Sequence, residues 1–350
     1  MEEAPFVAFR VLDVGPVAHT GLNPEAGGSL KDTRVNSCAP VLTTLGPGRI
    51  LLLMMIINIV SELGHGHRRF TMQALENDSV LPGSKLDAAK MPGHWLLARM
   101  GKKVLRPGGL TLTRRMLDGL AIGPRDRLVE LAPGLGATAR LALARRPASY
   151  VGVDRDGDAV ALVRRLAAET ATVVEGKKGD AANTGLADGH ASVVYGEAML
   201  TMQPANAKRR IVQEAFRVLA PGGRYGIHEM GLRPDDMPEG TKDTIMKDLS
   251  EAIRVGARPL TISEWRAVLE AEGFEVVTQE VSPMHLLEPR QMVRDEGVGG
   301  TLRILLNIAR NPIARRRILG MRRVFQRYES ALCGVMLVAR KPMIPATLAE

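Results

Sequence analysis

The segment Glu130-Leu-Ala-Pro-Gly-Leu-Gly136 decides how this 350-residue chain folds. It follows a short apolar run, 127–131, and precedes an alanine- and leucine-rich run, 137–146, which predict a strand and a helix. Gly134 and Gly136 carry no side chain, so a ligand can approach the backbone amides at the start of that helix. A strand, a glycine loop and a helix in this order are typical of nucleotide-binding α/β enzymes.

Strands and helices continue to alternate downstream of this loop. The predicted strands are 150–153, 171–174, 192–195, 224–228, 274–281 and 332–339. The predicted helices are 157–169, 207–219 (closed by Pro221-Gly-Gly223), and one that runs from the capping box Thr261-Ile-Ser-Glu264 to Gly273. This alternation predicts an α/β fold, in which a mostly parallel sheet is covered by helices on both faces.

Acidic residues occupy the positions that a nucleoside cofactor requires. Asp154 ends the second strand, where its carboxylate can accept both hydroxyls of a ribose. Asp180 follows the third strand, where a carboxylate can accept the amino hydrogens of adenine. Glu130 is a poor neighbour for a pyrophosphate but a good one for the cationic amino-acid end of S-adenosylmethionine. Since Gly134-x-Gly136-x-x-Ala139 also fits the dinucleotide fingerprint, a nicotinamide-dependent oxidoreductase is an alternative, which Glu130 disfavours.

In these motifs the chain resembles the class I S-adenosylmethionine-dependent methyltransferases, especially the small-molecule branch with the ubiquinone and menaquinone C-methyltransferases. The resemblance rests on Val129-Glu-Leu-Ala-Pro-Gly-Leu-Gly136, Val151-Gly-Val-Asp154, Gly179-Asp-Ala181 and Leu219-Ala-Pro-Gly-Gly223, and it covers roughly residues 120–282 and the last strand. It implies a Rossmann-like, seven-stranded, mostly parallel sheet with an antiparallel last strand, to which a helical cap is added. It also implies S-adenosylmethionine as the cofactor.

The resemblance gives each motif residue a role in cofactor binding. It implies that the methionine end lies against Glu130, Gly134 and Gly136, the ribose against Asp154, and the adenine against Asp180 and Ala181. Ala132 belongs to the same loop but departs from the family, which usually has glycine there. Its extra methyl group is expected to tighten the loop or to weaken cofactor affinity. Alternatively, these residues have structural roles and bind no cofactor: the glycines form a turn, Asp154 caps a helix and Asp180 is a turn residue.

Candidate bases for methyl transfer lie at the carboxyl ends of the fourth and fifth strands, where the acceptor is expected. They are Glu197, His228 and Glu229. Because neighbouring strand residues face opposite sides, His228 and Glu229 are not expected both to face the acceptor. Alternatively, His228 packs against a helix and Glu197 holds backbone amides. No Asn/Asp-Pro-Pro-Tyr motif follows the fourth strand, which argues against the amino-methylating DNA enzymes.

The composition limits the range of partners. Aromatic residues make up 3% of the chain, too few for the stacking platforms that bind single-stranded nucleic acid, so no nucleic-acid partner is expected. The two cysteines, Cys38 and Cys333, are too far apart in sequence for a disulfide framework or a zinc cluster, and they fit poorly with an arsenic methyltransferase. No metal site is expected.

The chain is expected to be cytoplasmic. It begins Met-Glu-Glu, without the basic start and apolar stretch of a signal peptide. The apolar run 50–60 is shorter than the about 20 residues that a spanning helix needs. The sequence leaves the oligomeric state open.

Four parts are predicted along the chain. They are an N-terminal extension that is poorly ordered or non-native (1–86), a helical cap segment (87–122), a methyltransferase domain (123–281 with 331–341) and a basic helical insertion (282–330).

The basic insertion contains an arginine-rich segment, 301–327. Seven arginines and no acidic residue lie between Thr301 and Gln326, in a chain of net charge +9. The segment is expected to be a helical pair on the domain, a lid over a small, apolar or lipid-like acceptor, or a helix in peripheral contact with a membrane. A further alternative is a non-catalytic protein that keeps the cofactor fold and uses these helices to bind a membrane or another partner.

Overall fold

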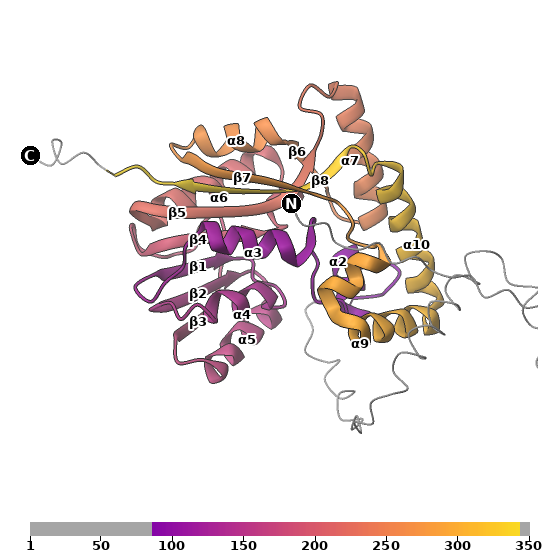
Figure 1. The fold of residues 1–350 in the computed structure, drawn as a ribbon, viewed down its shortest axis with the longest axis horizontal. Coiled ribbons are helices and arrows are strands. Elements are labelled where there is room, and N and C mark those ends of the chain that lie inside the picture. The colour runs from indigo at the N-terminus through magenta and orange to yellow at the C-terminus, as the bar shows by residue number, and fades with distance from the viewer. Residues whose placement is uncertain (1–85, 344–350) are drawn as a thin grey trace, which may run out of the picture. The chain divides into compact units, whose positions relative to one another are not determined.

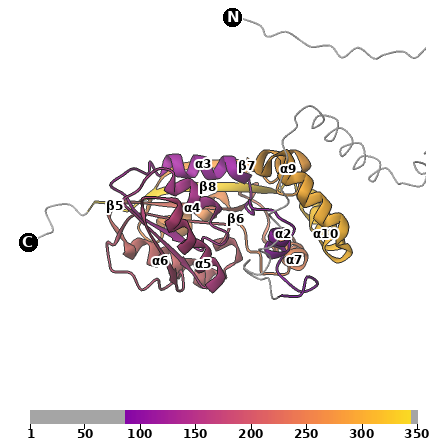
Figure 2. The same cartoon turned by 90° about the horizontal axis from the view of Figure 1, so that it is seen from below.

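The structure, a computed structural model, describes residues 86–343. The expectations for the N-terminal extension, the apolar run 50–60 and Cys38 lie outside these residues. The described part contains one sheet with helices on both faces, and further helices grouped at one end of the sheet (Figures 1 and 2). The predicted α/β fold is therefore confirmed.

The sheet has eight strands in the order β3-β2-β1-β4-β5-β8-β7, with β6 paired to β5 beside this path. The strands are β1 (Arg127–Leu131), β2 (Ser149–Asp154), β3 (Val173–Lys178), β4 (Ala191–Glu197), β5 (Leu219–Leu232), β6 (Leu260–Thr261), β7 (Glu275–Pro283) and β8 (Leu332–Arg340). All neighbours are parallel except β8, which runs antiparallel to both β5 and β7. The expected antiparallel last strand is thus confirmed, and the eighth strand is the two-residue β6.

Alternating strand residues build a separate apolar layer on each face of the sheet. One layer, with Val129 and Leu337, packs against α6 (Ala205–Val218) and α8 (Ile262–Glu270). The other, with Leu128 and Met336, packs against α3 (Gly109–Gly119), α4 (Ala137–Leu143) and α5 (Gly157–Leu166). Since side chains alternate along a strand, adjacent residues of β1 and of β8 serve opposite layers. The capping box at Thr261 and Glu264 is confirmed at the start of α8.

Two strands differ from the sequence prediction. The third strand was expected at 171–174, but β3 covers Val173–Lys178. It is an edge strand with β2 as its neighbour, so polar residues are tolerated and the apolar signal is weak. The fifth strand was expected to begin at Arg224, whereas β5 begins at Leu219, directly after α6. Its register against β4 shifts at Pro221-Gly-Gly223, which bulges from the strand instead of closing the helix.

The helices grouped at one end of the sheet form what we call the cap. They are α2 (Gly93–Arg99), α7 (Glu239–Ile253), α9 (Pro289–Arg310) and α10 (Pro312–Arg327). Their buried residues share an apolar cluster with Met230 and Leu232, at the carboxyl end of β5. The cap therefore covers the end of the sheet at which the candidate site was expected. In the described part of the chain, no helix is long and apolar enough to cross a membrane.

Candidate active site

The loop after β1 has an unusual backbone. Ala132, Gly134 and Gly136 have φ values of 56°, 54° and 69°, all in the left-handed region. This conformation is free of strain for glycine but strained for alanine. The backbone amide of Gly134 donates to Oδ2 of Asp154 (3.2 Å), and this hydrogen bond connects the loop after β1 to the end of β2.

Ala132→Gly is therefore expected to raise the free energy of unfolding by about 0.5 to 1 kcal/mol. The relief of left-handed strain, about 1 to 2 kcal/mol, exceeds the entropic cost of a new glycine, about 0.4 to 1 kcal/mol. Urea denaturation measures the change. Ala167→Gly is the matched control: Ala167 has an ordinary φ of −56° at the end of α5, so this substitution should destabilise. A loss of stability in both variants would contradict the strain at Ala132.

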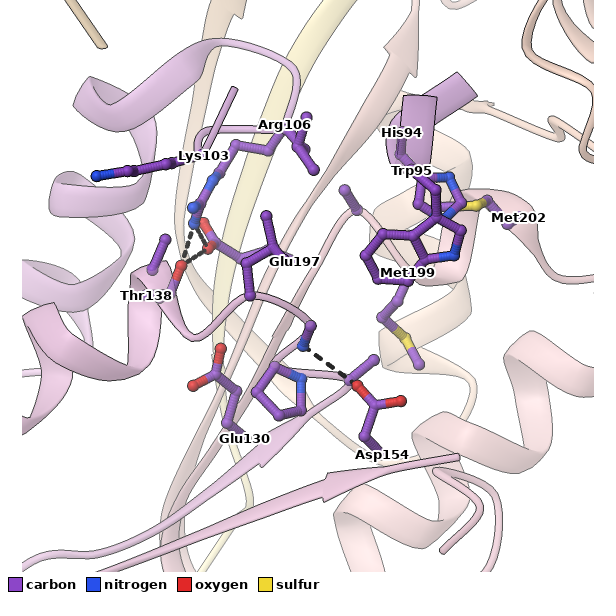
Figure 3. A pocket seen from close by; sticks show the side chains of 17 residues that line it. His94, Trp95, Lys103, Arg106, Glu130, Thr138, Asp154, Glu197, Met199 and Met202 are labelled. Carbon is purple, nitrogen blue, oxygen red and sulfur yellow. Dashed lines mark hydrogen bonds and ion pairs between the residues drawn. The ribbon is translucent and has the colours of Figure 1, made fainter. Parts of the chain in front are cut away.

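In front of this loop lies a cavity of about 200 Å³, which we call the cofactor cavity (Figure 3). Four of the predicted cofactor residues line it: Glu130, Ala132, Gly134 and Asp154. The other lining residues come from α2, the segment after it, α4 and the turn after β4; they include His94, Trp95, Lys103, Arg106, Thr138, Glu197, Met199 and Met202. The cavity thus joins the sheet to the cap.

Three predicted cofactor residues lie outside this lining. Gly136 caps the start of α4. Ala181 is buried in an apolar layer of the sheet. The carboxylate of Asp180 accepts from the backbone amide of Ala182 (2.8 Å) and pairs with Arg155 (2.7 Å), and these bonds lower its pKa. Asp180 is engaged as a turn residue here, so an adenine contact through it stays a prediction.

Glu130 is a buried carboxyl group on the wall of the cofactor cavity. Its Oε2 accepts from the hydroxyls of Tyr150 (2.5 Å) and Tyr195 (2.8 Å). Burial raises the pKa of Glu130 to about 7, although the two tyrosine bonds oppose the shift. Oε1 accepts no hydrogen bond from the described residues. A cation placed in this cavity would stabilise the ionised form.

Asp154 is fixed at the end of β2. Besides the bond from Gly134, its Oδ1 accepts from the amide of Asp156 (2.9 Å). Burial raises its pKa although these backbone bonds favour the ionised form. The carboxylate lies at the rim of the cofactor cavity, where it can accept hydrogen bonds from a ligand hydroxyl.

Glu197 is the centre of a buried charge cluster (Figure 3). Its carboxylate pairs with Arg106 and accepts from Thr138 and from Thr113 (2.6 Å), and it faces Nδ1 of His228 at 2.7 Å. Burial raises the pKa of Glu197, but Arg106 and His228 lower it further, to about 2. A carboxylate that is so strongly stabilised and fully bonded is a poor proton acceptor.

His228 and Glu229 point to opposite sides of β5, as expected, and both are fully buried. The Nε2 atom of His228 donates to the carbonyl of Pro107, and Nδ1 faces Glu197, so neither nitrogen is free for a substrate. Glu229 accepts from the amides of Met199 (3.0 Å), Leu200 (2.9 Å) and Thr201 (2.9 Å). It therefore shapes the turn after β4.

That one of these three residues is the base stays a prediction, which their bonding to other protein groups disfavours. Glu197 lines the cofactor cavity as the partner of Arg106, whereas His228 and Glu229 do not line it. Each of the three is engaged in holding another part of the site. As an alternative, Glu197 was expected to hold backbone amides. In the structure Glu229 has this role instead.

Acidic residues of α9 hold the segment that carries Arg106. Oε1 of Glu296 accepts from the amides of Lys103 (2.8 Å) and Val104 (2.9 Å), and Oδ1 of Asp295 accepts from the amide of Leu110 (3.0 Å). The long excursion before β8 thus reaches back to the cofactor cavity. Sequence reasoning missed this link because the partners are almost 200 residues apart.

A second cavity, of about 70 Å³, adjoins the first, and we call it the apolar cavity. The two share the lining residues His94, Leu105, Ala198 and Met202. The rest of its wall is almost entirely apolar and comes from the cap and the end of β5; it includes Leu97, Met230, Ile253, Met284, Leu286, Met321 and Phe325. The polar side chains in this wall belong to His94 and Thr201.

His94, Trp95 and Arg106 are the main site residues that sequence reasoning did not identify. They precede the first predicted strand and belong to no recognisable motif. The pairing of His94 with Trp95, whose ring centroids are 4.6 Å apart, is a weak signal in a chain with two tryptophans. This pair can be recognised as part of the site only from the structure, in which α2 lines the cavity.

Comparisons with known proteins agree with this geometry. Residues 128–223 match a family described as a methyltransferase domain. An uncharacterized protein of Haemophilus influenzae is 34% identical over 218 residues, which are 61% of this chain and 84% of that protein. An arsenite methyltransferase of Halobacterium salinarum is 28% identical over 166 residues, which are 47% of this chain and 40% of that protein.

Solved structures share the fold at lower identity. The phosphoethanolamine N-methyltransferase 2 of Haemonchus contortus, solved with phosphomonomethylethanolamine and S-adenosylhomocysteine, superposes with a TM-score of 0.52 and 16% identity. The match covers 72% of this chain and 57% of that one. At this identity the likeness concerns the fold alone.

Proposed function

We propose that the chain, whose residues 128–223 match a methyltransferase domain, is a class I S-adenosylmethionine-dependent methyltransferase that methylates a small, apolar acceptor bound in the apolar cavity. The observation that carries the proposal is the shared wall of the two cavities. His94, Leu105, Ala198 and Met202 line both, so an acceptor in one cavity lies beside a cofactor in the other. Such alignment is the main contribution that a protein makes to this reaction.

The residues of the cofactor cavity fit S-adenosylmethionine. When bound, this cofactor would supply an electrophilic methyl group on its sulfonium; the acceptor would attack the methyl carbon directly, with the sulfur as leaving group. The free oxygen of Glu130 suits the ammonium of the amino-acid end, and Asp154 suits the ribose hydroxyls. A pyrophosphate would instead meet the buried carboxyl of Glu130, which disfavours a nicotinamide dinucleotide.

The acceptor class follows from the wall of the apolar cavity. Met202, Met230, Met284 and Met321 contribute flexible thioethers, which adapt to the shape of a small apolar group. No carboxylate of the described residues lines this cavity, so a cationic acceptor would lack a counter-charge. Cys333 is buried within β8 and lines neither cavity, so it offers no ligand to arsenic there, despite the arsenite methyltransferase among the relatives.

Two measurements test the proposal. Calorimetry should show binding of S-adenosylmethionine and none of NADH; binding of NADH alone overturns it. Methyl-labelled S-adenosylmethionine, incubated with an organic-solvent extract of the source cells, should then label an apolar product.

A cavity-filling variant links that activity to the apolar cavity. Leu286→Trp places a large ring at its wall and should raise KM for the acceptor at least tenfold while leaving cofactor affinity unchanged. Leu306→Trp is the control, since Leu306 is exposed on α9. If both variants are equally active, the acceptor does not bind in the apolar cavity.

We propose that an outward-facing surface of the cap binds to an anionic membrane. An apolar acceptor could then reach the site from the lipid. Ile313 (51% exposed) and Leu319 (45% exposed) lie on α10 with Arg316 and Arg323. These two arginines have no ion-pair partner among residues 86–343, whereas Arg322 pairs with Glu288 on a neighbouring segment. Exposed apolar side chains among free arginines favour an anionic lipid surface.

Arg316→Gln combined with Arg323→Gln is therefore expected to weaken binding to phosphatidylcholine–phosphatidylglycerol vesicles about 30-fold, at about 1 kcal/mol for each charge. Co-sedimentation measures the binding. Arg125→Gln with Arg165→Gln removes the same charge from exposed positions elsewhere and should have little effect. If both pairs weaken binding equally, net charge is responsible instead of this surface.

A further inference from the structure

We propose that His94 is the catalytic base, and that the acceptor is an apolar compound with a phenol-type hydroxyl that is methylated on oxygen. This inference rests on the proposed function and narrows its acceptor. It starts from the position of His94, which lines the cofactor cavity (Figure 3) and also lines the apolar cavity. An imidazole at this junction lies beside the place where the acceptor oxygen must meet the methyl group.

The packing of α2 fixes the imidazole at that junction. The residue before it, Gly93, lies so close to α10 and α7 that an added Cβ would be 2.7 Å from Sδ of Met321 and 3.3 Å from Ile253. On the other side the ring of Trp95 stands 4.6 Å from the imidazole, tilted by 56°. The ring therefore has little freedom to leave the cavity wall.

Three other titratable groups that sequence analysis placed near the acceptor are bonded to protein groups. Glu197 and His228 bond to one another and to Arg106 and Pro107. Glu229 is buried under the turn after β4. By contrast, the imidazole nitrogens of His94 have no hydrogen-bond partner among the described residues. His94 is thus the group in the shared wall with a nitrogen available to a ligand.

The surroundings keep the imidazole uncharged. Burial lowers the pKa of His94 to about 4, so at neutral pH it can accept a proton. The walls that α7 and α10 contribute to the apolar cavity, Ile253, Met321 and Phe325, carry no charge. On the cofactor side the charged lining residues are Lys103, Arg106, Glu130, Asp154 and Glu197.

The step balances without any further reactant. The bond between sulfur and the methyl carbon breaks and its electron pair stays on sulfur, while the acceptor oxygen forms the new bond to carbon. The hydroxyl proton passes to the free nitrogen of His94 and then to solvent. Because the oxygen becomes strongly acidic as its bond to carbon forms, even a weakly basic imidazole can take this proton.

The test compares two acceptors that differ in their need for a base. At pH 8, thiophenol is already a thiolate, whereas phenol still carries its proton. We expect the wild type to methylate both, and His94→Gln to lower kcat for the phenol at least 100-fold but for the thiophenol less than fivefold. Calorimetry with S-adenosylmethionine should give the same affinity for both proteins.

Controls separate a chemical role from a structural one. His94→Asn serves as a second variant, and Arg99→Gln changes an exposed residue of the same helix. Phenol methylation by His94→Gln within tenfold of the wild type overturns the proposal, as does an equal loss for both acceptors. A wild type that binds the cofactor but does not methylate the phenol excludes the hydroxyl class. A wild type that binds no S-adenosylmethionine refutes the proposed function itself.

Discussion

Glu197→Ala is expected to lower the free energy of unfolding by about 3 to 5 kcal/mol at pH 7, the largest stability change that we predict. The substitution leaves Arg106 buried without its counter-charge and removes the carboxylate that Nδ1 of His228 faces. It also loosens the segment between α2 and α3, because His228 holds Pro107 there. Urea denaturation at pH 7 measures the loss.

The pH dependence gives an independent check. The pKa of Glu197 is lowered from 4.5 to about 2 in the folded protein, so its stabilising contribution is present above pH 4.5 and is lost as the pH falls toward 2. The alanine variant should lack this part of the acid-induced loss. Glu270→Ala, which breaks an exposed pair with Arg266, should cost less than about 1 kcal/mol. Similar losses in the two variants would show that the cluster contributes no more than a surface pair.

Local signals explain how much of this fold was predictable. The loop Ala132–Gly136 and the capping box at Thr261 depend on residues a few positions apart, and both were identified. The alternation of apolar runs predicted a parallel sheet covered on both faces, because buried strands and amphipathic helices leave distinct periods. Where a strand lies at an edge, as β3 does, that signal weakens and the boundaries were misplaced.

The chemistry of the site was less accessible to sequence reasoning. The carboxyl ends of β4 and β5 were taken as its neighbourhood, but the three titratable residues predicted there bind protein groups. Whether Glu197 faces Arg106 or a substrate depends on a segment 91 residues away in the chain. His94 likewise becomes a site residue only because α7 and α10 dock against α2. Such long-range packing leaves no periodic or motif signal in one sequence.

Glu130→Gln is expected to abolish the pH dependence of cofactor binding. In the wild type the pKa of Glu130 is about 7, and an ammonium binds to the ionised form. The affinity for S-adenosylhomocysteine should therefore rise about tenfold between pH 6 and pH 8, as the ionised fraction grows from about one tenth to nine tenths. Binding near pH 6.5 should release a proton, which calorimetry detects as a heat that depends on the buffer.

The glutamine variant should bind with one affinity across this range, and about tenfold to 100-fold more weakly than the wild type at pH 8, because a charge-assisted bond is lost. Glu175→Gln, on the exposed edge strand β3, is the control and should keep the wild-type dependence. Constant affinity of the wild type between pH 6 and pH 8 would mean that Glu130 does not meet the cationic end of the cofactor.

The same substitution should stabilise the empty protein, which separates a binding role from a folding role. The pKa of Glu130 is raised from 4.5 to about 7 on folding, so its favourable contribution is present below pH 4.5 and is lost as the pH rises through 7. The loss is on the order of 3 kcal/mol. Glu130→Gln avoids it and should unfold at higher urea concentration than the wild type at pH 8. If Glu130→Gln is more stable than the wild type but binds the cofactor more weakly, Glu130 serves cofactor binding. If the variant loses both stability and affinity, Glu130 is a structural residue.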